Sequence, residues 1–287
     1  MRNAYPKLLI LFVLAASAPL WAVAAERPFE KVYCLKYAEL KGYPLDGMLY
    51  GAPRDETIDL PMAMCVARRG SDVLLMDAGY VNQAIAAPWG GSSYVDYGAL
   101  FSEIDISLEQ VTHVTLSHLH WDHVGGTDRF PKAKFILQTR ELEYAAGAMP
   151  HNSMARIAVE KTDVLELVKL NWEDRVILVD GDREGVLPGV DVYLTPGHTI
   201  GTMTVCVATL KGRVCYASDA VYTYRNFEQD IPLGLALNSS QAVESFKKIR
   251  RLLRGGTLIP GHDPALFTRP ADFGFRKVSE HAIAIVE

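Results

Sequence analysis

Cysteine is scarce in this chain of 287 residues, and positive charge does not predominate. None of the 4 cysteines lies beside the histidine-rich segments described below, which excludes a cysteine-ligated metal site there. Lysine and arginine number 29 against 34 acidic residues, a formal net charge of -5, so no nucleic-acid partner is expected. No low-complexity linker or charge run divides the chain. These absences predict a single large α/β domain over residues 26–287.

The amino terminus carries a long apolar run. Two basic residues precede an uncharged stretch over residues 8–25, which ends in small residues just before Glu26. This pattern predicts a secretory signal peptide over residues 1–25 and a periplasmic or secreted protein. An uncleaved membrane anchor is the alternative, since the stretch is near the shortest length that spans a bilayer. A proline and the small residues at its end favour cleavage, so no stable membrane insertion is expected afterwards.

Export would place the cysteines in a compartment that permits disulfides, and four cysteines allow three pairings. Cys206 and Cys215 flank a predicted hairpin turn at Lys211-Gly212. That turn would set Cys215 opposite Ala208 and leave Cys206 diagonal to it. We therefore expect free, buried thiols at these two positions. The sequence does not decide whether Cys34 and Cys65 pair.

Histidine is concentrated in three short segments, and in two of them the histidine directly follows a Pro-Gly pair. The segments are Ser117-His118-Leu119-His120-Trp121-Asp122-His123, Thr195-Pro196-Gly197-His198 and Pro260-Gly261-His262, with a lone Asp219 between the last two. His118 and His120 follow an apolar, β-branched run over residues 111–116, so they lie where a buried strand ends. Asp122 and His123 come next, in a turn that can direct them to a second ion. The segments predict ligands for two metal ions.

Only imidazole nitrogen and carboxylate oxygen are offered as ligands, and this donor set suits zinc and its first-row neighbours. We expect two divalent ions per chain, zinc first, with iron, cobalt or manganese as alternatives. Burying so many imidazoles and a carboxylate together without a cation would be costly. The isolated histidines His113, His151 and His281 are better explained as ordinary packed residues and are left out of the site.

The order of elements predicts two sheets packed face to face with helices outside. A glycine-rich and aromatic segment over residues 80–100 is either a lid over a pocket or an ordinary surface loop. A helix opens at Ser107 with Gln110 three residues on, and a later amphipathic helix runs from about Ser240 to Arg254. The expected strands are 29–35, 61–67, 72–76, 111–116, 133–138, 175–179, 191–194 and the hairpin 203–216, with further helices within 139–170.

These motifs resemble those of the metallo-β-lactamase superfamily, in which an H-x-H-x-D-H segment, a Gly-His, an aspartate and a last Gly-His build a two-metal site. The resemblance covers nearly all of residues 26–287 and implies a four-layer αββα sandwich. It further implies that Asp219 and a hydroxide bridge the ions. One metal would be held by His118, His120 and His198, and the other by Asp122, His123 and His262.

Within the superfamily, the stretch after Ser218-Asp219 resembles the N-acyl-homoserine lactonases. Tyr222 holds the position of a tyrosine that reaches the substrate carbonyl there, and Trp121 that of an aromatic substrate neighbour. The resemblance implies lactone ring opening by the bridging hydroxide, with Tyr222 stabilising the oxyanion and Asp122 returning a proton. The chain departs from many relatives after His198, where Thr199-Ile200-Gly201-Thr202 replaces a second histidine.

Several alternatives share the ligand set. A periplasmic β-lactamase is weakened by Asp219 at the bridging position, and a glyoxalase II type thioesterase lacks its glycine-rich basic stretch here. A nuclease would normally carry an added domain and a basic surface. Hydrolysis of other lactones, aryl esters or organophosphates is the nearest rival, and an idle metal-binding module is a non-enzymatic one. A homodimer is compatible with the sequence, which does not determine the oligomeric state.

Overall fold

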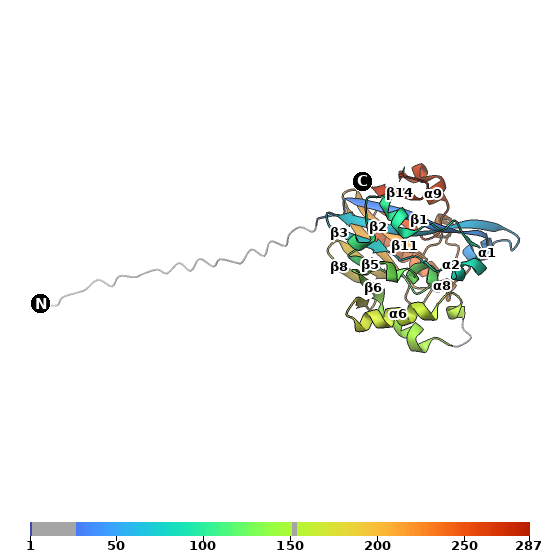
Figure 1. The fold of residues 1–287 in the computed structure, drawn as a ribbon, viewed down its shortest axis with the longest axis horizontal. Helices are drawn as coiled ribbons and strands as arrows, with labels where there is room; N and C mark the ends of the chain where they lie inside the picture. Colours follow the sequence, from blue (N-terminus) through green and yellow to red (C-terminus); the bar gives the residue numbers. More distant parts are fainter. Residues whose placement is uncertain (2–26, 151–153) are drawn as a thin grey trace.

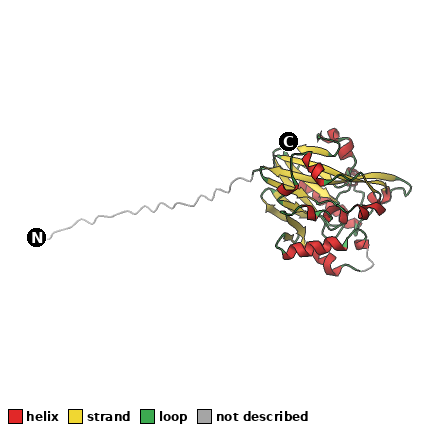
Figure 2. Cartoon of the chain, viewed as in Figure 1, coloured by secondary structure: helices red, strands yellow, loops and turns green. Residues whose placement is uncertain are grey.

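The computed structural model describes Met1 and residues 27–150 and 154–287. The predicted leader therefore lies outside the described residues apart from Met1, and so does His151. In the described part, strands form two sheets and helices lie outside them (Figures 1 and 2). This arrangement confirms the predicted α/β sandwich. None of the described helices has both the length and the apolar character needed to cross a bilayer.

The first sheet has the order β13-β14-β1-β2-β3-β5-β6-β7, and β4 joins it by pairing with β1. From β3 to β7 the strands are parallel, whereas β14, β1, β2 and β3 pair antiparallel. Their bounds are β1 Lys31–Pro44, β2 Thr57–Arg69, β3 Asp72–Met76, β4 Gly91–Ser92, β5 His113–Thr115, β6 Lys134–Gln138, β7 Val176–Val179, β13 Arg276–Lys277 and β14 Ala282–Val286.

The second sheet has the order β12-β11-β10-β9-β8. Strands β8 to β11 pair antiparallel, and β12 lies parallel to β11. Strands β9, β11 and β12 therefore run in one direction, so their carboxyl ends share one edge of the sheet. The bounds are β8 Arg183–Leu187, β9 Val190–Leu194, β10 Met203–Thr209, β11 Gly212–Ser218 and β12 Thr257–Pro260.

The helices are mostly short. The longest are α6 (Lys161–Trp172) and α8 (Ser239–Leu253), and α8 matches the predicted amphipathic helix, with the Asn238 side chain capping its start. The others are α1 Leu45–Met48, α2 Gln83–Ala86, η1 Ala87–Trp89, α3 Tyr97–Ser102, η2 Leu108–Gln110, α4 Trp121–Val124, η3 Thr127–Arg129, α5 Thr139–Glu143, η4 Tyr144–Ala148, η5 Met154–Arg156, α7 Tyr224–Gln229, α9 Ala265–Thr268 and η6 Pro270–Phe273.

Alternation along the strands builds the layers. In β1, Val32 and Cys34 belong to a core that also contains Val205 and Tyr216 of the second sheet, so this core fills the space between the sheets. Tyr33 and its alternate neighbours point the other way, into a cluster shared with α3 and α6. Helix α8 packs on β11 from the outer side of the second sheet. The four layers are thus helix, sheet, sheet and helix.

The two longest strands exceed their predictions. The expected strand 29–35 is part of β1, which continues to Pro44, and 61–67 lies within the longer β2. Register shifts between Lys36 and Ala38 and between Leu40 and Tyr43 interrupt the alternation, so the pattern could not be followed past them. Past these register shifts, β1 and β2 remain paired and continue as a long hairpin (Figure 1).

The prediction of free thiols at Cys206 and Cys215 is wrong. Thr209 pairs with Gly212, so the hairpin turn is one position earlier than expected, at Leu210 and Lys211. This register sets Cys206 directly opposite Cys215, and the two form a disulfide. A second disulfide joins Cys34 of β1 to Cys65 of β2, which also face each other across paired strands.

Candidate metal centre

The candidate ligands stand where strands of both sheets end. β5 ends at Thr115 and leads into His118 and His120, and α4 then carries Asp122 and His123 in a single helical turn. On the second sheet, His198, Asp219 and His262 follow the carboxyl ends of β9, β11 and β12. The structure brings all seven predicted ligands together at this edge. They form two groups, His118, His120, His198 and Asp219 in one, and Asp122, His123 and His262 in the other.

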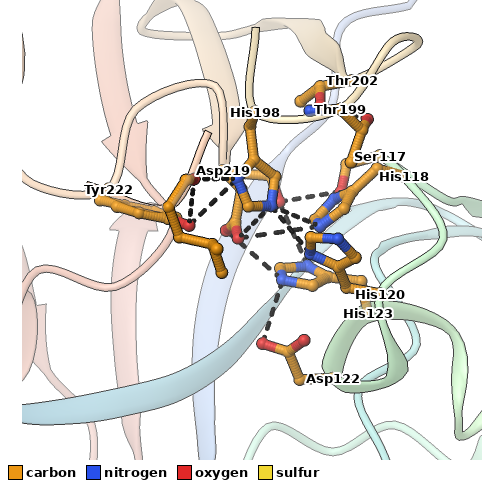
Figure 3. A network of polar contacts seen from close by, with 12 residues as sticks. Ser117, His118, His120, Asp122, His123, His198, Thr199, Thr202, Asp219 and Tyr222 are labelled. Atoms are coloured by element: carbon orange, nitrogen blue, oxygen red, sulfur yellow. Dashed lines mark hydrogen bonds and ion pairs between the residues drawn. The ribbon is translucent and has the colours of Figure 1, made fainter. Parts of the chain in front are cut away.

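The first group has imidazole nitrogens that face one another. Nε2 of His198 lies 2.9 Å from Nδ1 of His120 and 3.1 Å from Nε2 of His118 (Figure 3). Burial lowers the pKa of His120 to about 3, and burial likewise lowers the pKa of His198. The rings are therefore neutral, and nitrogen lone pairs converge on one point. A cation held between them would replace lone-pair repulsion by coordination.

The second group is joined to the first by Asp219. One carboxylate oxygen, Oδ2, lies 3.2 Å from Nε2 of His198, and the other, Oδ1, lies 3.0 Å from Nε2 of His262 and 3.4 Å from Nε2 of His123. Burial opposes the charged carboxylate, yet the surrounding imidazoles hold the pKa of Asp219 well below its usual range. Asp219 is therefore ionised, and its two oxygens face different groups.

Two buried polar atoms at this junction support a cation. Nε2 of His123 and Oδ1 of Asp219 make no hydrogen bond to any described residue, although both are shielded from solvent. Unpaired buried polar atoms cost about 1–3 kcal/mol each, and an uncompensated buried charge costs more. Nitrogen and oxygen donors from two carboxylates and five imidazoles satisfy the coordination preferences of divalent zinc. The residues present therefore fit two divalent ions.

Hydrogen bonds behind the imidazoles hold the rings in orientation. Nδ1 of His118 lies 2.9 Å from Oγ of Ser117, and Nδ1 of His198 lies 2.9 Å from the Leu235 carbonyl. Nδ1 of His262 lies 3.0 Å from the carbonyl of Pro61. When Nδ1 donates its proton outward, the Nε2 lone pair is left facing the centre.

Asp77 directly follows the expected strand 72–76 and was not among the predicted site residues, yet it accepts several hydrogen bonds behind the second group. Its Oδ2 accepts from Nδ1 of His123 at 2.8 Å and from Oγ of Ser218 at 2.7 Å. Its Oδ1 accepts from the backbone N–H of Ser117 at 2.7 Å. Because β3 and β5 are parallel neighbours, Asp77 stands beside the segment that bears His118. An aspartate at the carboxyl end of the adjacent strand was the available signal.

Glu141 was also missed, and it explains the segment after His198. The buried Glu141 carboxylate accepts from Oγ1 of Thr199 and from the backbone N–H of Gly201, both at 2.6 Å. Burial raises the pKa of Glu141 despite these bonds. Helix α5 thereby holds the turn that follows His198. No local sequence pattern links residues 58 positions apart.

A pocket opens onto the two groups. Trp121 and Tyr222, the predicted substrate neighbours, both line it, together with Asp122, Asp219 and His262. Trp89 also lines it, so the segment 80–100 forms part of the pocket wall, and β4 ties that segment to β1. The segment contains short helices and a strand, and it lies beside the site.

The hydroxyl of Tyr222 points at His198. It lies 3.0 Å from Nδ1 of that ring and donates to the Leu235 carbonyl at 3.2 Å (Figure 3). Burial raises the pKa of Tyr222 well above its usual value, so the phenol keeps its proton and remains a donor. The histidines left out of the site bond elsewhere, His113 to Thr112 and His281 to Glu103.

The chain is similar to known hydrolases. Residues 63–262 match the sequence model of the metallo-beta-lactamase superfamily. An N-acyl homoserine lactonase of Bacillus cereus is 32% identical over 155 residues, and the match covers 54% of this chain and only 56% of that protein. The N-acyl homoserine lactonase AttM of Azorhizobium caulinodans is 29% identical over 233 residues, covering 76% and 86% of the two chains. A crystal structure of a quorum-quenching N-acyl homoserine lactone lactonase shares the fold, with a TM-score of 0.71, 22% identity and coverage of 84% and 95%.

Proposed function

Because the chain belongs to the metallo-beta-lactamase superfamily, we propose that it is a dinuclear metal-dependent hydrolase that opens the ring of N-acyl-homoserine lactones. The main support for this proposal is that Asp219 presents one oxygen to each of two ligand groups, next to a pocket lined by Trp121 and Tyr222. The curated relatives with lactonase names support the substrate class.

In the proposed site, His118, His120 and His198 would hold one ion and Asp122, His123 and His262 the other, with Asp219 placed between the two groups. Two bound cations would lower the pKa of a shared water to about 7 and polarise the lactone carbonyl. We propose zinc as the metal, because imidazole nitrogen and carboxylate oxygen are ligands that zinc takes in proteins. Metal analysis would distinguish zinc from iron, cobalt and manganese.

The chain's own residues perform the remaining steps. The Tyr222 hydroxyl hydrogen rotates from the Leu235 carbonyl to the substrate carbonyl oxygen, where negative charge develops as water adds to the carbon. The added water gives up a proton to the Asp122 carboxylate. The ring C–O bond then breaks, and Asp122 delivers that proton to the leaving alkoxide oxygen. The product is the N-acyl-homoserine, a hydroxy acid. Tyr37 donates to the Asp122 backbone carbonyl at 2.7 Å and so steadies this residue from behind.

The test pairs metal analysis with turnover. The purified protein is assayed on an N-acyl-homoserine lactone, a β-lactam, a thioester and p-nitrophenyl acetate, and its bound metal is measured by mass spectrometry. We expect two metal ions per chain and fastest turnover on the lactone. Faster turnover on another substrate would replace lactonase by that activity. Two ions with no hydrolysis at all would favour an idle metal-binding module.

We also propose that the protein is exported, with residues 1–25 removed and residues 26–287 as the mature domain. The two disulfides support this proposal, because disulfides persist in oxidising compartments and are rare in the cytosol. Mass measurement of the protein recovered from the producing cells tests it. The expected mass is that of a chain beginning near Glu26 with no free thiol, and a full-length, reduced chain would contradict export.

A further inference from the structure

The hairpin of β1 and β2 supplies one whole wall of the pocket. Five lining residues come from this hairpin and from α1 at its tip, and they are Leu40, Tyr43, Met48, Leu60 and Met62. Four of these side chains are aliphatic or thioether. The phenol of Tyr43 is therefore the single polar side-chain group that this wall presents to the pocket.

The hydroxyl of Tyr43 makes no hydrogen bond to any residue that the structure describes, and the side chain is half-buried. By contrast, the hydroxyls of Tyr37, Tyr97 and Tyr222 all donate to backbone carbonyls. A donor that is partly withdrawn from water and left unpaired inside a pocket is available to a ligand.

The position of Tyr43 is constrained. A Cβ built on Gly47 of α1 would come within 2.7 Å of the Tyr43 ring and 3.1 Å of its hydroxyl oxygen, so the ring lies directly against the glycine backbone. Burial raises the pKa of Tyr43 to about 12, and the negative charges of Asp122 and Asp219 contribute to this rise. Tyr43 is thus a protonated donor in the wall of the pocket that Asp122 and Asp219 also line.

We propose that Tyr43 is a substrate-binding residue that donates a hydrogen bond to the amide carbonyl of an N-acyl lactone, while the apolar wall around it accommodates the acyl chain. This inference rests on the proposed function. In such a substrate the amide is attached to the carbon next to the lactone carbonyl. When the lactone carbonyl lies at Asp219 and Tyr222, the amide is directed toward a neighbouring wall, and Tyr43 is the donor that the hairpin wall offers.

The test uses two substrates that differ by the amide. Wild type, Tyr43→Phe and Tyr50→Phe are assayed on N-decanoyl-homoserine lactone and on an alkyl γ-lactone of similar length without an amide. Tyr50 is the matched control, since it follows α1 on the same connection but is 65% exposed. Loss of one neutral hydrogen bond should lower kcat/KM of Tyr43→Phe for the N-acyl lactone by roughly three- to tenfold, mainly through KM. Turnover of the alkyl lactone should be little changed, and Tyr50→Phe should match wild type.

Binding of the ring-opened N-decanoyl-homoserine, measured by calorimetry, provides a readout independent of turnover. Its affinity should fall by the same factor in Tyr43→Phe and in Gly47→Ala, which displaces the ring without removing the phenol. Equal losses on both substrates, or no loss on either, would overturn the role of Tyr43 while leaving the lactonase proposal standing. A wild-type protein that opens neither lactone would overturn the proposed function, and this inference with it.

Discussion

Oδ2 of Asp77 accepts a hydrogen bond from Nδ1 of His123 over 2.8 Å, and the same oxygen accepts from Oγ of Ser218. One buried carboxylate at the end of β3 thus connects the segment that carries His123 with the strand end that carries Asp219. The proposed metal centre is thus held in shape by a residue that belongs to neither ligand group.

Asp77→Asn should weaken metal binding. The amide cannot accept all the hydrogen bonds of the carboxylate, so His123 loses its fixed tautomer and orientation. We expect metal affinity to fall by about ten- to a hundredfold, as for other residues behind metal-binding histidines. Competition with a chelator of known affinity measures this. Asp128→Asn, at a side chain 62% exposed and outside the site, is the control and should bind metal like wild type.

Tyr222→Phe should separate metal binding from turnover. The phenylalanine keeps the ring in the pocket but removes the proposed oxyanion donor, so turnover should fall by roughly ten- to a thousandfold. Metal content should stay unchanged, since the backing bond from Nδ1 of His198 to the Leu235 carbonyl remains. Kinetics and metal analysis on the same sample check both points, and undiminished turnover would remove Tyr222 from the mechanism.

Asp122→Asn should impair both proposed tasks of this side chain. The amide is a weaker ligand for the second ion and cannot return a proton to the alkoxide. We expect turnover to fall by about a hundred- to ten-thousandfold, the range for loss of a general acid. Metal stoichiometry should fall below that of wild type. Two ions per chain together with full activity would show that Asp122 has neither role.

Metal removal should lower thermal stability. Stripped of its ions, the centre retains converging imidazoles and the unpaired Oδ1 of Asp219. A ligand present at a hundredfold excess over its Kd stabilises the folded state by about 2.7 kcal/mol, which for a chain of this size corresponds to a Tm shift of about 5–10 °C. Calorimetry before and after dialysis against chelator, and after zinc is restored, measures the shift. An unchanged Tm would argue against tight binding.

Asp163 in the first turn of α6 should make stability depend on pH. Burial, followed by the neighbouring charge of Glu160, raises the pKa of Asp163 to about 6, and its Oδ2 has no hydrogen-bond partner among the described residues. The folded state therefore binds this proton more tightly than the unfolded state does. Stability from this residue is present at acidic pH and is lost as the pH rises toward 6.

Asp163→Asn removes this titration. We expect the variant to have a higher Tm than wild type at pH 7 and above, with the difference shrinking as the pH falls below 6. Thermal unfolding from pH 4.5 to 8 (roughly the span over which such a carboxyl titrates) measures the difference. A constant difference across this range would show that the charge of Asp163 is not responsible.

Local sequence was sufficient to predict that the candidate ligands lie together at one sheet edge. His118, His120 and Asp219 follow apolar runs directly, and a strand that ends in a polar turn places those side chains at the sheet edge whatever the rest of the fold. The same periodicity predicted α8 and the two-sheet arrangement, because alternation along a strand and a 3.6-residue period are properties of short segments.

Only the tertiary structure decided what lies behind and across from those ligands. Asp77 and Glu141 bond to residues 40 to 141 positions away, and Tyr43 lies on a separate wall of the pocket, and no local period encodes such contacts. The Cys206–Cys215 disulfide depended on a hairpin register that shifted by a single turn position. Short-range pattern determines which face a side chain occupies, whereas its partners are determined by strand pairing and packing between segments distant in the chain.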